Sequence, residues 1–303
     1  MQLLKQIFEV RNLNNKHKQI TIFGIKIKIK RMIYSKQLME NILQNEDNIY
    51  KFVKTVVKEE NRLQQTNIST AFLHQKTFLP FKNIYAEREI VIVASGPSAK
   101  YYTKPVKDAI HIAVNRSFLL ENVNFDYIFI QDYSGPTKSY IEDLINYQPQ
   151  SCAKFFGLTC EYGDMKRVIP ESLACRANAL RYRTDWAPVR FFEPKFAYDI
   201  STQPLGCFGS IVFPALQFAL WTNPKTIYLV GCDCTNDGYF NSANRSTEFQ
   251  PDNIYLAYEK FKHFVKIYYP ETKIVSVNPV RLKGLFDNDL YTENMQNSYY
   301  KQQ

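Results

Sequence analysis

Several short runs of small and polar residues follow apolar segments of the sequence, and their side chains could bind a ligand. Ser95-Gly96-Pro97-Ser98 follows one apolar segment, and Asn115-Arg116 follows the next. Gly96 lets the backbone approach a phosphate closely, and we expect Ser98 to cap a following helix whose N-terminus attracts anions. The alternative is an ordinary turn. The run matches neither Walker A nor G-x-G-x-x-G, so neither ATP hydrolysis nor NAD binding is indicated.

Further segments carry side chains of the same kind. Gln131-Asp132 and Asn278 each follow an apolar run, and the run at 226–230 leads into Asp233-Cys234-Thr235-Asn236-Asp237-Gly238-Tyr239. Gly209-Ser210 opens a helical pattern, which gives either a second anion-attracting helix N-terminus or a plain N-cap. These residues are the candidates for binding and chemistry.

The elements that position these residues can be predicted from the apolar pattern. Short apolar, β-branched runs bounded by turn residues indicate buried parallel strands, at 89–94, 109–114, 127–130, 154–158, 226–230 and 273–277. Apolar stripes at helical spacing indicate helices at 209–221 and 255–268. We therefore expect an α/β fold of modified Rossmann-like type, with a mainly parallel sheet and helices on both faces. Ligands of such sheets bind at the carboxyl ends of the strands.

No metal site or cofactor is expected. The six cysteines are scattered, and we interpret them as reduced and mostly buried. His17 and His74 are expected to lie outside the α/β region, and His263 is expected to be solvated. Asp287-Asn288-Asp289 has a spacing that can bind a divalent metal, but a solvated loop is favoured.

The net charge of +9 is concentrated at the start of the chain, where residues 1–36 hold nine lysines and arginines against Glu9 alone. Alternating Ile and Lys up to Lys30 predicts strands, with Gly24 as the turn. A basic segment interleaved with apolar residues suits an anionic membrane surface, and a solvated lysine-rich hairpin face is the alternative. Nucleic acid is not expected as a partner.

The remaining N-terminal sequence predicts one or two helices over 37–66 and an irregular connector over 67–88. We therefore divide the chain into a basic N-terminal extension, 1–88, and an α/β domain, 89–303. No run approaches the ~20 apolar residues of a membrane-spanning helix. The charged start does not resemble a signal peptide, so a cytoplasmic protein is expected.

Three motifs together resemble a known family: Ile92-Val93-Ala94-Ser95-Gly96-Pro97-Ser98, Val114-Asn115-Arg116, and 215–220 running into 227–233. Over roughly 88–280 the chain resembles bacterial lipooligosaccharide sialyltransferases of glycosyltransferase family 42. It is also similar to the wider group of motility accessory factors and hydroxymethylpterin pyrophosphokinase-like proteins. The resemblance implies a nucleotide-binding domain with a lid, a CMP-sialic acid donor, and inverting, metal-independent transfer.

The resemblance and the strand-end positions together predict the donor-binding residues. They are Ser95, Gly96, Pro97, Ser98, Asn115, Arg116, Gln131, Asp132, Gly209, Ser210 and Asn278. Ser95 replaces the usual Asn of the family's nucleotide loop, and Arg116 stands where Gln is usual.

The predicted catalytic residues are Tyr239, Asp233, Asp237 and Thr235. The family places two tyrosines on the leaving phosphate, and here Tyr239 is available with Thr235 at the other position. The family's lid histidine has no counterpart between 240 and 259. The candidate bases are therefore carboxylates: Asp233, Asp237, Glu248 and Asp252.

The sequence thus predicts a glycosyltransferase at the inner face of a bacterial inner membrane, and it leaves a homo-oligomer open as its assembly. It would move a sialic or related nonulosonic acid from a CMP-sugar onto a surface glycan such as lipooligosaccharide. One alternative is a magnesium-dependent phosphotransferase that uses Asp233, Asp237, Asp287 and Asp289. Another is a non-catalytic nucleotide-sugar-binding protein of glycan assembly.

Overall fold

The computed structural model describes residues 8–14, 17–22, 25–30, 46–131, 133, 135–147, 152–159, 168–185, 195–241 and 251–292. The chain forms two compact units, residues 1–64 and 65–303. The boundary between them falls within the 33-residue helix α3 (Glu46–Phe78).

The first unit contains an antiparallel sheet in the order β1 (Phe8–Asn14), β2 (His17–Ile22), β3 (Ile25–Lys30). The strands predicted on either side of Gly24 are confirmed as β2 and β3, whereas β1 was not predicted. Lys28 lies opposite Gln19, which lies opposite Arg11, so these three polar residues share one face. Ile20 is buried on the other face. Gly24 lies outside the described residues.

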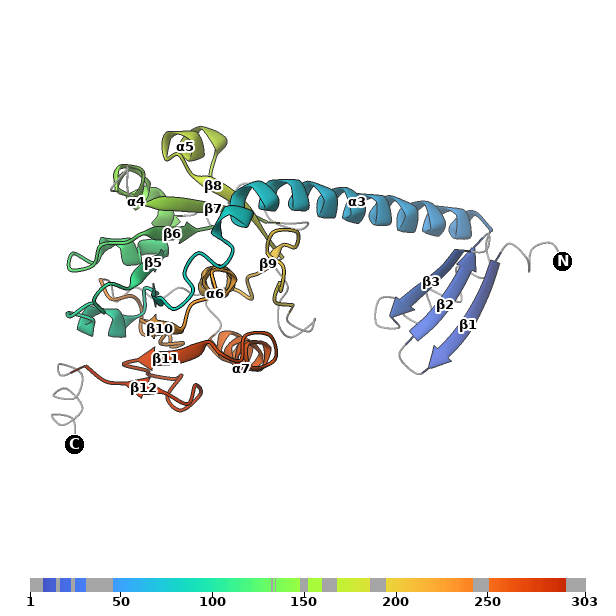
Figure 1. Ribbon diagram of the computed structural model, residues 1–303. Coiled ribbons are helices and arrows are strands. Elements are labelled where there is room, and N and C mark those ends of the chain that lie inside the picture. The colour runs from blue at the N-terminus through green and yellow to red at the C-terminus, as the bar shows by residue number, and fades with distance from the viewer. Residues whose placement is uncertain are drawn as a thin grey trace. The chain divides into compact units, whose positions relative to one another are not determined.

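The second unit is built on a nine-stranded sheet whose neighbouring strands are all parallel, which confirms the predicted fold class (Figure 1). The strands are β4 (Glu89–Val93), β5 (Ile110–Val114), β6 (Tyr127–Ile130), β7 (Ala153–Thr159), β8 (Leu180–Asp185), β9 (Leu205–Gly206), β10 (Thr226–Val230), β11 (Lys273–Val277) and β12 (Asp289–Leu290). Their order is β12-β11-β10-β4-β5-β6-β7-β8-β9. The chain proceeds outward from β4 in one direction and from β10 in the other, so the strand order reverses between these two strands.

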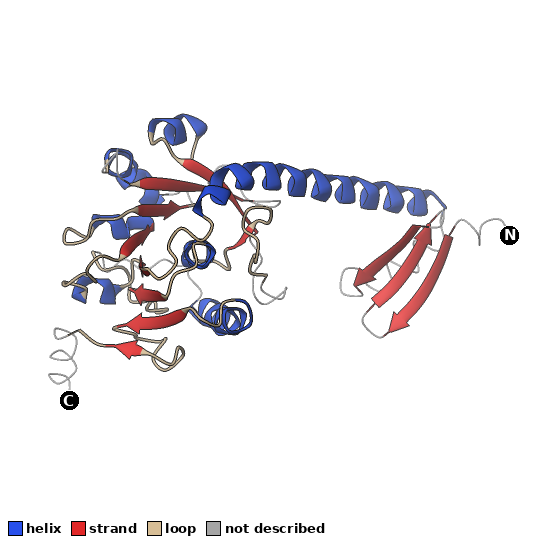
Figure 2. Cartoon of the chain, viewed as in Figure 1, coloured by secondary structure: helices blue, strands red, loops and turns tan. Residues whose placement is uncertain are grey.

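Helical segments cover both faces of this sheet (Figure 2). On one face, α6 (Val212–Trp221), α7 (Pro251–Tyr268) and the end of α3 share a core with β4 to β8. The other face is covered by α4 (Gly135–Asn146), α5 (Glu171–Arg176) and the short 3-10 helices η3 (Pro97–Tyr101) and η4 (Asn115–Leu119). All ten residues of α6 are buried, as expected for a helix between a sheet and further layers.

The C-terminal half of α3 corrects the prediction of an irregular connector, which is wrong for 67–78. Its buried residues Thr70, His74, Thr77 and Phe78 are spaced as one helical face. Thr77 Oγ1 donates to the Arg181 carbonyl at 2.8 Å, and His74 Nε2 accepts from the Arg183 N–H at 2.7 Å. These side chains bond the backbone of β8 on the edge that the two-residue β9 leaves uncovered. His74 therefore belongs to the α/β unit, contrary to expectation.

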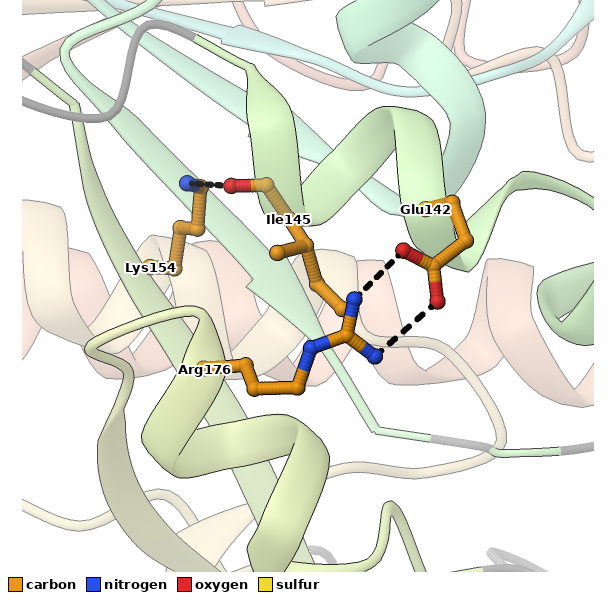
Figure 3. Close-up of polar contacts among 4 residues, drawn as sticks. All are labelled: Glu142, Ile145, Lys154 and Arg176. Carbon is orange, nitrogen blue, oxygen red and sulfur yellow. Dashed lines mark hydrogen bonds and ion pairs between the residues drawn. The ribbon is translucent and has the colours of Figure 1, made fainter.

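Polar contacts join α4 to the sheet and α5 to α4 (Figure 3). Lys154 on β7 is 2% exposed, and its Nζ donates to the Ile145 carbonyl in the last turn of α4 at 2.9 Å. A cation at this position interacts favourably with the C-terminal end of the helix dipole. Burial lowers the pKa of Lys154. Arg176 of α5 forms a two-pronged ion pair with Glu142 of α4, at 2.7 and 3.1 Å.

Candidate functional site

The loops that leave β4 and β10 meet where the strand order reverses, the position at which open α/β sheets bind ligands. Ladder hydrogen bonds continue past the strand ends, from Ala94 N to Val230 O at 2.8 Å and from Gly96 N to Gly231 O at 3.0 Å. A Cβ on Gly96 would lie 2.4 Å from the Gly231 oxygen, and one on Gly231 would lie 2.4 Å from the Ala94 oxygen. Both loops therefore require glycine for this close approach.

A buried carboxylate joins the same two loops. Asp233 accepts from the Ser98 N–H at 2.7 Å through one oxygen and from the Ser98 hydroxyl through the other. Both residues are buried. Desolvation raises the pKa of the Asp233 carboxyl, while the two bonds from Ser98 act in the opposite direction.

This contact corrects the expected role of Ser98. Its side chain caps no helix, because Ser98 lies within the five-residue η3, and η3 has no side-chain cap. The Ser98 donors that were expected near a phosphate are instead bonded to the carboxylate of Asp233. The Asp233 carboxylate thus stabilises the loop after β4 from within the protein.

The end of β5 differs, because Asn115 and Arg116 have few partners within the described part of the chain. Asn115 is half-buried in the left-handed conformation, with φ 54°, and its amide has no hydrogen-bond partner in the described part of the chain. The Arg116 guanidinium carbon lies 4.1 Å from the ring centroid of Tyr239 and 6.0 Å from that of Tyr140. One Arg116 N–H donates to Asn241 at 3.4 Å, and no carboxylate of a described residue pairs with this cation.

Tyr239 reaches Arg116 because its loop is tied to the β4 loop. The Phe240 N–H donates to the Ser95 carbonyl at 3.0 Å. The structure thus brings together three of the predicted residues, Asn115, Arg116 and Tyr239, from two loops that lie far apart in the sequence. Sequence reasoning missed Tyr140, which lies on α4.

Two other predicted amides are already bonded within the protein. Gln131 Nε2 donates to Thr184 Oγ1 at 2.6 Å, and Gln131 Oε1 accepts from Cys207 at 3.4 Å. Asn278 exchanges hydrogen bonds with Thr292, at 2.8 and 3.0 Å, and so joins the ends of β11 and β12. Asp132 lies outside the described residues.

The remaining predicted donor-site residues lie before α6. Gly209 is exposed with φ 78°, and Ser210 Oγ accepts from the Val212 N–H at 3.4 Å. The helix itself begins at Val212, three residues later than the sequence pattern predicts. Because α6 follows β9, its N-terminus lies at the carboxyl edge of the sheet.

The candidate bases occupy different environments. Asp237 is exposed, and Thr235 beside it is half-buried. Asp252 forms an ion pair with Arg281 at 2.6 Å, and Glu248 lies outside the described residues. Among these carboxylates, Asp237 is exposed and lies on the same loop as Tyr239.

The Asp287-Asn288-Asp289 segment is tied down by its neighbours. Asp287 is exposed, as expected for a solvated loop, and pairs with Lys262 at 3.0 Å. The solvated-loop prediction is wrong for Asp289, which begins β12 and is half-buried. Its Oδ2 accepts from the Gly284 N–H at 2.9 Å, and its Oδ1 is buried without a hydrogen-bond partner in the described part of the chain. A search of the described residues finds no group of three or more His, Cys, Asp or Glu side chains placed to hold a metal.

The cysteines and His263 are mostly as predicted. The cysteines in the described ranges are free thiols, of which Cys152, Cys207, Cys232 and Cys234 are buried and Cys175 is exposed. Burial raises the pKa of Cys232 to about 12. His263 is exposed on α7, as predicted.

Comparisons with known proteins show a distant structural likeness. No protein-family model and no curated protein sequence matches the chain significantly. Among solved structures, the chain is similar to the MAf glycosyltransferase from Magnetospirillum magneticum AMB-1, with 12% sequence identity and a TM-score of 0.43. The alignment covers 77% of this chain and 41% of that one, so the chain spans about two fifths of the length of that protein. No helix in the described ranges is long and apolar enough to cross a membrane.

Proposed function

We propose that the chain is a glycosyltransferase that takes a sialic or related nonulosonic acid from a CMP-sugar and transfers it to a cell-surface glycan such as lipooligosaccharide. The observation that carries the proposal is the Arg116 guanidinium, which lies over the Tyr239 ring and has no carboxylate partner among the described residues. The neighbouring residue Asn115 has an amide without a hydrogen-bond partner in the same part of the chain. An arginine without a carboxylate partner, held at the ligand edge of an α/β sheet, suits a phosphate oxygen.

The same groups account for catalysis of sugar transfer. As the glycosidic bond breaks, negative charge develops on the departing CMP, and fixed donors near that phosphate lower the barrier. Arg116 and the Tyr239 hydroxyl supply these donors, and Asn115 binds the nucleotide. Asp237 is the exposed carboxylate of the same loop and acts as the base that deprotonates the acceptor hydroxyl. Asp233 acts as a positioning residue, because its carboxylate is bonded to Ser98.

The phosphotransferase alternative requires carboxylates that are free to hold magnesium. Asp233 is bonded to Ser98, Asp287 to Lys262, and Asp289 to the backbone of Gly284. Of the four carboxylates that this alternative uses, Asp237 is exposed, and Asp289 Oδ1 has no hydrogen-bond partner among the described residues. The contacts of Asp233 and Asp287 favour sugar transfer over magnesium-dependent phosphoryl transfer.

The test is a calorimetric titration of the full chain with CMP, UDP and ATP, with and without magnesium. We expect CMP to bind most tightly and equally well in EDTA, and a CMP-nonulosonate to be turned over with release of CMP. Tight binding of ATP only in the presence of magnesium would support the phosphotransferase instead. Binding of the CMP-sugar without any release of CMP would indicate the non-catalytic alternative.

We also propose that residues 1–36 hold the protein at the anionic inner face of the inner membrane. Lys26 and Lys28 are exposed on β3, and the strand register places Arg11 on the same face as Lys28. Each lysine near an anionic surface contributes about 1 kcal/mol. Lys26→Glu with Lys28→Glu is expected to abolish sedimentation with phosphatidylserine vesicles, with neutral vesicles as the control. Unchanged sedimentation would exclude this face as the contact.

A further inference from the structure

Two arginines on β8, Arg181 and Arg183, face the side of the sheet that α4 and α5 cover. Along β8, Tyr182 lies in the aromatic core on the α6 side, next to Phe129 and Phe78. Because successive side chains of a strand point to opposite faces, Arg181 and Arg183 lie on the other face. Arg181 is paired in register with Phe156, which belongs to the core of that second face.

The strand register places Arg183 beyond the ends of the central strands. Val114, the last residue of β5, pairs with Phe129 on β6. Phe129 pairs with Phe155 on β7, which pairs with Leu180 at the start of β8, so Val114 and Leu180 stand at the same level of the sheet. Arg183 is three residues further along, so it stands roughly 10 Å past the end of β5 in the strand direction. This is the edge at which Asn115 and Arg116 lie.

The Arg183 side chain is half-buried and short of partners. Its Nε is buried without a hydrogen-bond partner, and no described carboxylate forms an ion pair with its guanidinium, including that of Asp185 on the same face. The backbone N–H of Arg183 is bonded to His74, which fixes this part of the strand. Leaving a buried donor without a partner is unfavourable, and a bound anion could provide that partner.

Arg181, the other arginine on this face, carries the same charge as Arg183 and therefore does not balance it. The contacts of the two side chains differ. Arg181 Nη2 donates to the Ile169 carbonyl at 3.0 Å, and its Nε lies 3.6 Å from the carboxylate of Glu171, so it helps to hold α5. Its Nε and Nη1 are buried without a hydrogen-bond partner, as is the Nε of Arg183, but Arg181 has a carboxylate beside it and Arg183 has none among the described residues. Arg181 thus adds positive potential beside Arg183 but is itself partly engaged. Of the two arginines, Arg183 is the one whose guanidinium has no carboxylate partner among the described residues, so it is available to a ligand.

We propose that Arg183 binds an anionic group of the acceptor, so that the acceptor is an acidic glycan; this inference rests on the proposed function. Three strand spacings separate β5 from β8, which is about 14 Å. The Arg116 guanidinium lies over Tyr239 of the loop after β10, and β10 lies on the side of β5 away from β8. We therefore assign a donor phosphate to Arg116 and an acceptor anion to Arg183. A guanidinium binds carboxylate and phosphate alike through paired N–H donors.

The test measures binding of small acidic sugars to the full chain in the presence of CMP. Glucuronate and glucose 6-phosphate are the probes, and glucose is the neutral control. The wild type is expected to bind at least one acidic probe and not glucose, and the probe that binds shows whether the anion is a carboxylate or a phosphate. Arg183→Gln is expected to weaken that binding by about tenfold or more. Arg183→Lys keeps the charge without the paired donors, so it is expected to be intermediate.

Arg176→Gln is the matched control, because Arg176 is an exposed arginine on α5 that is paired with Glu142, and its loss should leave acidic-sugar binding unchanged. Affinity for CMP is measured in each variant, so a failure of CMP binding, which concerns the proposed function, is distinguished from a failure at Arg183. The proposal is overturned if neither acidic probe binds better than glucose, or if Arg183→Gln binds as tightly as the wild type. If the glutamine variant does not fold, the same comparison is made with Arg183→Lys.

Discussion

The strand ends at the ligand edge fall into two kinds. At β4 and β10 the backbone and side chains are bonded to each other, through Gly96 and Gly231 and through Ser98 and Asp233. At β5 the Asn115 amide and the Arg116 charge are left free of such partners. Both kinds consist of small and polar residues in the sequence. The difference shows that residue type identifies the edge, whereas the partners brought by the fold decide which groups can meet a ligand.

Gly231→Ala tests the bonded strand ends and should have the largest effect. Gly231 has φ 67° and no space for a Cβ, which would lie 2.4 Å from the Ala94 oxygen. We expect a loss of about 2–5 kcal/mol in the free energy of unfolding, from left-handed strain and overpacking together. Gly284→Ala is the control, because Gly284 has φ 71° with open space around it. An equal loss in both variants, measured by urea denaturation, would show that strain alone matters.

Tyr239→Phe tests the free strand end. The ring that stacks on Arg116 is kept and one hydroxyl is lost, so turnover is expected to fall by about 10²–10³ with CMP affinity nearly unchanged. Tyr239→Leu removes the ring as well, and we expect it also to weaken CMP binding because Arg116 is no longer held. Full turnover by the phenylalanine variant would assign Tyr239 to packing alone.

His74 lies at the edge of the sheet beside β8, where its polar groups are bonded within the protein as at β4 and β10. Both of its ring nitrogens are hydrogen-bonded to backbone atoms. Burial lowers the pKa of His74 from 6.5 to about 4. The unfolded chain therefore binds a proton below about pH 6.5 that the folded protein does not bind until about pH 4. Stability supplied by neutral His74 is complete above pH 6.5 and should decline by about 3 kcal/mol as the pH falls to 4. His74→Gln should show a shallower decline in urea denaturation across this range, and an identical slope would refute the assignment.

Asn115→Gly gives the smallest expected effect. Glycine keeps the left-handed conformation and removes the amide, so CMP affinity should fall by the ~0.5–1.5 kcal/mol of one hydrogen bond, with little change in melting temperature. Asn83→Gly is the control, because Asn83 is another asparagine with positive φ, at 58°, and is exposed. A drop in melting temperature with unchanged CMP affinity would make Asn115 structural.

The strands whose side chains are almost all buried were predicted well from the sequence. The apolar runs of β4, β5, β6, β10 and β11 lie within one residue of the observed strands. The strand β8 was missed because Arg181 and Arg183 alternate with Tyr182 and Thr184, which dilutes the apolar signal. The end of α3 was missed because its buried face consists of Thr70, His74 and Thr77, polar residues that only the edge of β8 satisfies.

The site was predicted less completely, for a related reason. The residues at the strand ends were identified from their positions, but the sequence gives no sign that Asp233 bonds to Ser98 or that Arg116 lies on Tyr239. These pairs join segments separated by more than half of the α/β unit. Local pattern cannot predict which side chain such a fold brings to which partner.

The pairing of β4 with β10 also has a consequence for how the chain is made. Glu89 pairs with Thr226, so the apolar strand Ile90–Val93 keeps one open edge until most of the unit has left the ribosome. At roughly 5–20 residues per second, this interval lasts on the order of ten seconds. An uncovered, apolar, β-branched edge can pair with the wrong strand or with another chain. During that interval β4 is therefore the segment of the nascent protein most in need of a chaperone.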